Sequence, residues 1–158
     1  MEQLRALFLQ ILFIFLITTA FTYPQNVTNK NNILYVELFG NGVTASFNYE
    51  RVMSNHFSTR LGLGFIYTTS ESNSGYHRDF GFLPLVMINY LYQIYGNNYF
   101  ELGGGAITSL VSYEPTFAAG YRYSPNNGGF FFSLALDMFT NFDNNSFYWG
   151  GMGIGARF

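Results

Sequence analysis

The feature that most constrains this chain is an alternation of apolar with small or charged side chains, which recurs along most of its length. Successive side chains of a β-strand point to opposite faces, so a period of two gives each predicted strand one apolar face. The segment 147–158 shows the pattern clearly, because its second face holds Trp149, glycines and Arg157. A transmembrane barrel turns such an apolar face to lipid. The apolar face of this segment carries Tyr148, Met152, Ile154, Ala156 and Phe158.

The composition favours the same class of protein. Aromatic residues make up 21% of the chain and charged residues 10%, whereas soluble domains carry about 25% charged residues. Beyond its N-terminal segment, the chain lacks the unbroken apolar runs of about 20 residues that a helical membrane protein needs. The absence of cysteine excludes a disulfide framework. Seven Lys and Arg against nine Asp and Glu leave no basic surface for nucleic acid.

The N-terminal segment has the layout of a secretory signal peptide. Arg5 precedes an apolar run at 6–17, and the small residues of 18–20 suit a cleavage site. The run is shorter than the roughly 20 residues of a comfortable spanning helix, although a retained membrane anchor is the alternative interpretation. We therefore expect three parts, which are a signal peptide at 1–20, a polar lead-in at 21–31 and one transmembrane β-barrel at 32–158.

Turn residues divide the predicted barrel into eight alternating segments. An even number of strands places both termini on one side, and an exported outer-membrane chain begins in the periplasm. The longest connection, 69–79, then faces outwards, as does the turn 40–42, which is unusually short for an outward loop. The fold expected is an all-β, eight-stranded, antiparallel up-and-down transmembrane barrel. Its strands are predicted at about 32–39, 43–52, 57–68, 80–92, 99–110, 116–123, 129–140 and 147–158.

Strand parity places seven charged residues on the face opposite to lipid. A basic residue on the lipid face costs about 2–4 kcal/mol near the midplane and about 0–1 kcal/mol at the rim. Arg51 is the exception, predicted on the lipid face at the periplasmic rim. Because unpaired buried charges are costly, we expect the seven to pair inside a lumen just wide enough for side chains. This predicted luminal charge network is Glu37, Glu50, Arg60, Glu101, Arg122, Asp137 and Arg157.

Several short segments carry a resemblance to a known group. The signal peptide, the segments 35–38, 47–51 and 100–105, and the closing Gly155-Ala156-Arg157-Phe158 are examples. The chain resembles the small eight-stranded outer-membrane barrels of Gram-negative bacteria, of the OmpA-transmembrane and OmpX type, especially uncharacterised outer-membrane barrel proteins of Bacteroidetes. The resemblance implies a bacterial outer-membrane location with periplasmic termini. It also implies two partners, outer-membrane lipids and the barrel-assembly machinery, which would recognise the aromatic-terminated last strand. It implies no catalytic residues and no cofactor.

Chemistry is expected to be absent or confined to one loop. Ser70, His77 and Asp79 supply a nucleophile, a base and an acid within 69–79, as acyl transfer would require, but no strained elbow or oxyanion motif accompanies them. No residues have metal-ligand spacing, and His56 stands alone in a predicted turn. We therefore expect a structural or surface-interaction role in the cell envelope. The alternatives are a small-solute conduit, a lipid-modifying outer-membrane enzyme, and a soluble secreted barrel that binds a hydrophobic ligand.

Overall fold

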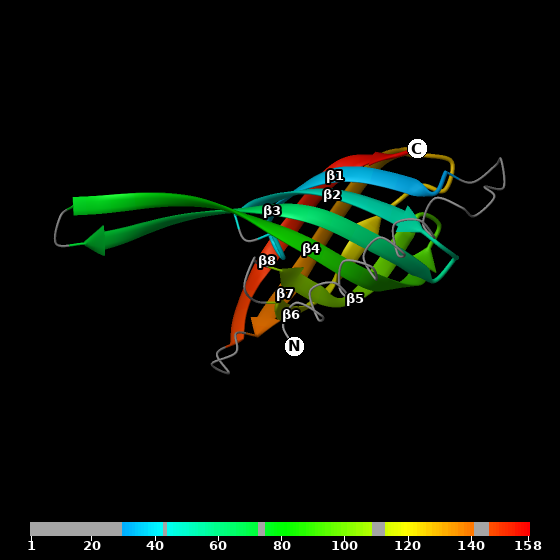
Figure 1. Ribbon diagram of the computed structural model, residues 1–158. Helices are drawn as coiled ribbons and strands as arrows, with labels where there is room; N and C mark the ends of the chain where they lie inside the picture. Colours follow the sequence, from blue (N-terminus) through cyan, green and yellow to red (C-terminus); the bar gives the residue numbers. More distant parts are fainter. Residues whose placement is uncertain (1–29, 43, 73–74, 109–112, 141–145) are drawn as a thin grey trace, which may run out of the picture.

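The chain folds into a closed barrel of eight antiparallel strands (Figure 1), which confirms the predicted all-β architecture. The computed structural model describes residues 30–42, 44–72, 75–108, 113–140 and 146–158, so the predicted signal peptide lies outside the described residues. Each strand pairs with the next, and β8 closes the barrel on β1. No helix in these ranges is long and apolar enough to cross a bilayer. The strands are β1 (Asn32–Phe39), β2 (Ala45–Val52), β3 (Phe57–Ser72), β4 (Gly75–Tyr95), β5 (Asn98–Thr108), β6 (Tyr113–Tyr123), β7 (Gly129–Thr140) and β8 (Ser146–Arg157).

One connection differs from the prediction. The polar stretch 69–79 is not a loop, because β3 and β4 continue to pair through it, with Thr69 opposite Arg78. Backbone hydrogen bonds maintain this ladder without an apolar pattern in the side chains, so the polar composition of 69–79 predicted a loop where the strands continue. β2 accompanies β3 only as far as Phe65, and β5 accompanies β4 only from Leu85, so the two strands project beyond the barrel as a ribbon (Figure 1).

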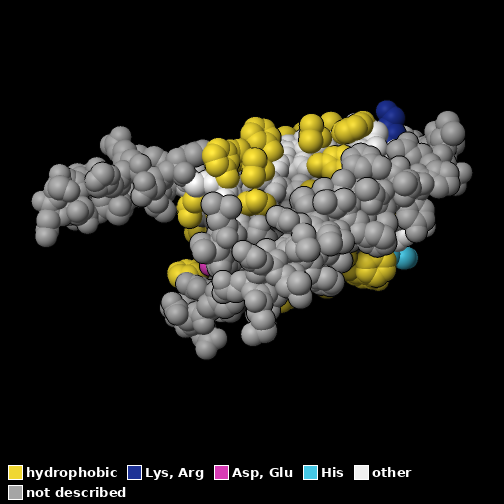
Figure 2. Space-filling model, viewed as in Figure 1, with side chains coloured by type: hydrophobic (Ala, Val, Ile, Leu, Met, Phe, Trp, Pro, Cys, Tyr) yellow, Lys and Arg dark blue, Asp and Glu magenta, His cyan; other side chains and the backbone are white. Residues whose placement is uncertain are grey.

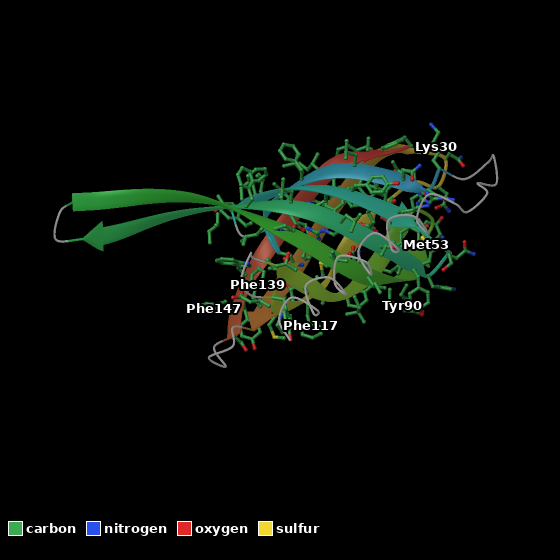
Figure 3. All side chains as sticks on the ribbon, viewed as in Figure 1. Lys30, Met53, Tyr90, Phe117, Phe139 and Phe147 are labelled. Carbon is green, nitrogen blue, oxygen red and sulfur yellow. The ribbon has the colours of Figure 1, made fainter. Side chains whose placement is uncertain are left out.

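The two ends of the barrel are distinguished by this ribbon and by the chain terminus. We call the end with the projecting β3–β4 ribbon the hairpin end; the β1–β2 turn lies there as well. The opposite end, here the C-terminal end, holds Phe158 and the β2–β3, β4–β5 and β6–β7 connections. Lys30 and Met53 mark the C-terminal end in Figure 3.

The outer wall of the barrel is apolar. Leu34 is 55% exposed and Leu136 is 73% exposed, whereas Glu37 on the other face of β1 is 3% exposed. Tyr90 and Phe117 likewise project from the wall (Figure 3). Figure 2 shows hydrophobic side chains gathered over β1 and β2. This arrangement follows from strand parity, since one alternate set must face outwards once the sheet closes.

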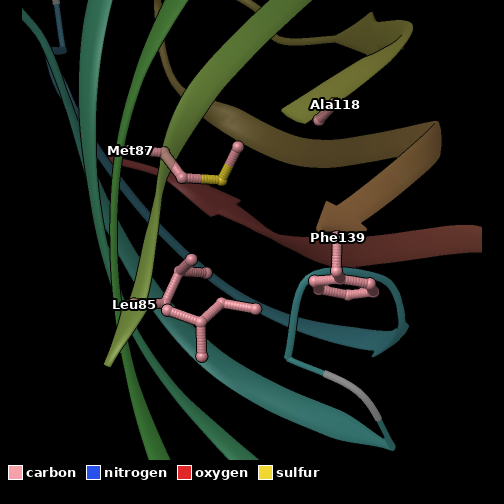
Figure 4. Packing of buried hydrophobic residues seen from close by; sticks show 5 residues of the cluster. Leu85, Met87, Ala118 and Phe139 are labelled. Atoms are coloured by element: carbon pink, nitrogen blue, oxygen red, sulfur yellow. The ribbon is translucent and has the colours of Figure 1, made fainter. Parts of the chain in front are cut away.

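The interior contains apolar side chains as well as charged ones, so the expectation of a polar lumen is incomplete. Ile33, Tyr35 and Phe131 form one buried cluster. A second cluster lies toward the hairpin end, where the Phe139 ring lies beside the β1–β2 turn (Figure 4). Eight strands leave an interior that side chains fill, and apolar groups fill the space that ion pairs do not occupy. The second cluster comprises Leu85, Met87, Ile107, Ala118 and Phe139.

Candidate functional site: the barrel interior

Arg122 of β6 is the centre of the ionic network. Its Nη1 lies 2.5 Å from Glu50 Oε1, and its Nη2 lies 2.7 Å from Glu101 Oε2. A further hydrogen bond of 2.8 Å joins Nη2 to Glu50 Oε2, so Glu50 is held by both arms of the guanidinium. Arg122 is 1% exposed and Glu50 0%. Strands β2, β5 and β6 are therefore tied together across the lumen by one cation and two carboxylates.

A second ion pair joins Arg60 of β3 to Glu37 of β1. The Nε of Arg60 donates to Asn48 Oδ1 at 2.9 Å, and the Ser46 hydroxyl donates to Glu37 Oε2 at 3.3 Å. Asn48 and Ser46 were not among the predicted site residues. The signal that identifies them is parity, because both lie on the same face of β2 as Glu50.

Two aromatic rings inside the lumen complete the ionic layer. Tyr35 and Phe131 pack with their ring centroids 4.7 Å apart. The Arg60 guanidinium lies 5.3 Å from the Tyr35 ring centroid, and that of Arg122 lies 5.2 Å from the Phe131 centroid. A desolvated guanidinium over an aromatic face is attracted by the ring quadrupole. Neither ring was predicted as a luminal partner, although strand parity places Tyr35 on the face of Glu37 and Phe131 on the face of Ser133.

Asp137 of β7 is buried but lies outside the ionic network. It forms no ion pair with any described residue, so the expectation that all seven charges pair is wrong at this position. The Asn41 amide donates to Asp137 Oδ1 at 2.6 Å instead. The second carboxylate oxygen, Oδ2, is buried without a hydrogen-bond partner. Sequence alone could not identify this contact, since Asn41 and Asp137 lie 96 positions apart.

The short turn between β1 and β2 closes the hairpin end from within. Left-handed backbone at Phe39 (φ 55°) and Gly40 (φ 87°) redirects the chain, and Asn41 becomes 0% exposed. The Asn41 side chain accepts a hydrogen bond from Thr116 and donates to Asp137. Trp149 Nε1 donates to the Gly40 carbonyl at 3.2 Å. The turn is short because it lies inside the barrel, which accounts for a length that is unusual in an exposed loop.

Arg157 of β8 is the second charge without an ionic partner among the described residues. Its Nε donates to the Lys30 carbonyl at 2.5 Å, and its Nη1 donates to the Ser124 carbonyl at 3.3 Å and hydroxyl at 3.2 Å. The predicted pairing is therefore wrong for Arg157 also. In place of the predicted carboxylate, Arg157 has neutral hydrogen-bond acceptors from the segment before β1 and from the β6–β7 connection.

A polar pocket of about 340 Å³ lies at the C-terminal end, and Arg157 forms part of its wall. Tyr99, which is 6% exposed, lines the same pocket and donates its hydroxyl to Asn126 Oδ1 at 3.3 Å. The pocket is the open counterpart of the closed hairpin end. Other neutral polar residues in its lining are Asn31, Ser54, Asn55, Gln93, Ser124 and Asn126.

Arg51, expected on the lipid face at the rim, is 6% exposed, whereas Phe47 on the same face of β2 is 59% exposed. The apolar face of β8 lies on the outer wall, with Tyr148 73%, Ile154 47% and Phe158 52% exposed. Met152 and Ala156 share that exposed face.

The possible catalytic and metal-binding residues lie in the β3–β4 ribbon and at His56. The side chains of Ser70, His77 and Asp79 lie outside the described residues, although backbone pairing sets Ser70 opposite His77. His56 Nδ1 lies 3.3 Å from the Leu91 carbonyl, and the ring stacks on Tyr90. No three His, Cys, Asp or Glu side chains among those described come together as a metal ion requires.

The fold and interior define a class, which is a closed eight-stranded barrel with an apolar wall and an ionic layer across its lumen. Comparison with models of protein families, with curated proteins and with solved structures gave no match.

Proposed function

We propose that this protein is an outer-membrane β-barrel of a Gram-negative bacterium, with a side-chain-filled lumen and a structural or surface-interaction role in the cell envelope. The observation that carries the proposal is the inverted distribution of side chains. Large apolar groups such as Leu134 (48% exposed) and Ile88 (59% exposed) cover the outside, while Glu50 and Arg122 are buried inside. Soluble monomers rarely expose contiguous apolar patches of more than a few hundred Å².

The alternatives fit the interior less well. A conduit needs a continuous lumen, whereas the Arg122 network and the Asn41 turn fill it at two levels. A soluble barrel for a hydrophobic ligand needs an apolar cavity inside and charges outside, which is the opposite of this arrangement. A lipid-modifying enzyme would need its catalytic groups at the rim, and the only sequence candidates lie in the ribbon at 69–79.

The projecting ribbon supports the surface-interaction part of the proposal. Beyond Phe65 and before Pro84, β3 and β4 pair only with each other among the described residues, so the outer edge of each strand has no neighbouring strand in that part of the chain. A free strand edge presents unpaired N–H and C=O groups that can hydrogen-bond to another chain. With both termini in the periplasm, this ribbon would extend from the outer surface of the cell.

The proposal is tested by comparing two arginine substitutions in the reconstituted protein. Leu134→Arg lies at the middle of the wall and is expected to cost about 2–4 kcal/mol of folding free energy in lipid vesicles. Tyr95→Arg, at the C-terminal end of β4 where Tyr95 is 81% exposed, is the matched control and is expected to cost about 0–1 kcal/mol. The measurement is denaturant unfolding from vesicles.

Two results would contradict the proposal. One is a protein that stays monodisperse in buffer without detergent, and the other is an equal, near-zero cost for both substitutions. In planar bilayers, the purified protein is expected to give no stable conductance, and reproducible single-channel steps would favour the conduit instead.

A further inference from the structure

We propose that the pocket at the C-terminal end is a binding site for a small anionic molecule, in which the Arg157 guanidinium holds a carboxylate or phosphate group. The pocket lies at the mouth of the lumen, beyond the Arg122 network. The inference depends only on this end of the barrel and stands whether or not the protein spans a membrane.

The first argument is charge. Arginine is almost never fully buried unless it is paired, yet Arg157 is 5% exposed and the acceptors of its hydrogen bonds are neutral. Tyr99 and, more weakly, Glu50 are the acidic groups whose fields act on it, and Arg122 already holds both oxygens of the Glu50 carboxylate. A buried cation of this kind lacks a counter-charge, which an anion from solution would supply.

The second argument is the lining of the pocket. It contains no acidic side chain, so nothing in the wall repels an anion. Lys30 lies at the same end, and its backbone N–H donates to the Asn126 carbonyl at 3.1 Å, which ties it to the wall. Amide and hydroxyl groups make up most of the remaining lining, as in Asn31, Ser54 and Gln93. These groups suit the neutral hydroxyls or amides of a polar ligand.

The third argument is size and preorganisation. The volume of about 340 Å³ lies at the lower end of the 300–1,000 Å³ typical of small-molecule sites. Contacts with Lys30 and Ser124 fix the plane of the Arg157 guanidinium before any ligand arrives. The guanidinium N–H groups that these contacts leave open can donate charge-assisted hydrogen bonds to carboxylate or phosphate oxygens. The ligand expected is a sugar acid, a sugar phosphate or a short peptide with a free carboxylate.

The experiment follows the Arg157 Nε–H resonance of the ¹⁵N-labelled full chain, folded in detergent micelles. The probes are glucuronate, glucose 1-phosphate and N-acetylalanine, with glucose as the neutral control. At least one anion is expected to shift the resonance with a saturable isotherm, and glucose is expected to leave it unchanged. The anion with the highest affinity distinguishes a sugar acid, a phosphate and a peptide carboxylate as the natural source.

Matched variants test the role of the charge. The Arg157 variants lack the Arg157 Nε–H resonance, so binding to them and to the wild type is also followed by the backbone N–H resonance of Ser124. Arg157→Gln is expected to weaken binding by about tenfold or more, because it removes the positive charge and its charge-assisted hydrogen bonds. Arg157→Lys keeps the charge and is expected to fall between wild type and Arg157→Gln. Lys30→Gln, which removes an exposed charge at the same end, is expected to weaken binding by no more than about fivefold.

Preserved Nε resonances of Arg60 and Arg122 establish that each variant is folded, so loss of binding cannot be ascribed to unfolding. Three outcomes would overturn the proposal. These are no saturable shift with any of the anions, an equal response to glucose, and wild-type affinity in folded Arg157→Gln.

Discussion

The two ends of the lumen differ, because one is filled by the chain itself and the other keeps a pocket. At the hairpin end the chain itself fills the opening, with Asn41 buried at 0% exposure and the Phe139 cluster packed beside it. At the C-terminal end a polar pocket of about 340 Å³ remains, and Arg157 forms part of its wall. The Arg122 network lies between the two ends and separates the pocket from the turn.

The difference shows three ways of accommodating a buried charge within one barrel. Arg122 is neutralised by two carboxylates. The Asp137 carboxylate accepts a hydrogen bond from the side-chain amide of Asn41, which lies in the β1–β2 turn. Arg157 donates its hydrogen bonds to neutral oxygens of the protein and borders the pocket. The first solution ties strands together, the second anchors a turn, and the third leaves a cation available for a ligand.

The largest effect is expected at Arg122. Arg122→Met leaves Glu50 and Glu101 buried without their cation, which is expected to destabilise the barrel by about 3–5 kcal/mol. Denaturant unfolding in detergent, followed by Trp149 fluorescence, measures the loss. The control is the triple variant Arg122→Met/Glu50→Gln/Glu101→Gln. It also removes the two unpaired carboxylates and is expected to recover most of the stability. Stability within about 1 kcal/mol of wild type in the single variant would mean that the network is not the central tie.

A smaller effect is expected at the closed end. Asn41→Ala removes the amide that hydrogen-bonds to Asp137 and Thr116, and leaving these groups unsatisfied is expected to cost about 1–3 kcal/mol. Trp149 fluorescence is expected to change in the folded state, because its indole N–H donates to Gly40 in the same turn. A double-mutant cycle with Asp137→Ala gives the check. A coupling energy near zero would show that Asn41 does not anchor the turn through this carboxylate.

The smallest effect on stability is expected at Arg157. The hydrogen-bond partners of Arg157 are neutral, so Arg157→Gln leaves no buried carboxylate without a cation. The expected loss of folding free energy is about 1 kcal/mol or less. The same unfolding assay measures it beside Arg122→Met. A cost as large as that of Arg122→Met would contradict the contrast between the two arginines, since it would indicate a strong ionic partner for Arg157.

Much of the fold could be predicted from the sequence, because alternation and turn residues are local. Eight strands were expected, and the barrel has eight. The boundaries failed where local hydrophobicity stopped being informative. The ribbon at 69–79 pairs through its backbone, and backbone pairing leaves no mark in an apolar pattern.

Parity also explains how far the site could be predicted. It gives the face of a strand, which is enough to group Glu37, Glu50 and Arg122. It does not give the partner across the lumen, because that depends on the register and stagger of strands far apart in the chain. For this reason the Arg122 network could be expected as a set of charges, whereas the Asn41–Asp137 contact could not.

The sequence by itself determined that the chain would form paired strands with one apolar and one ionic face, because side-chain direction alternates with every residue. Closure of the barrel decided which charges meet, which remain without a counter-ion, and that the turn at Asn41 folds inwards. Those outcomes are set by distances across the lumen, which exist only once β8 has paired with β1.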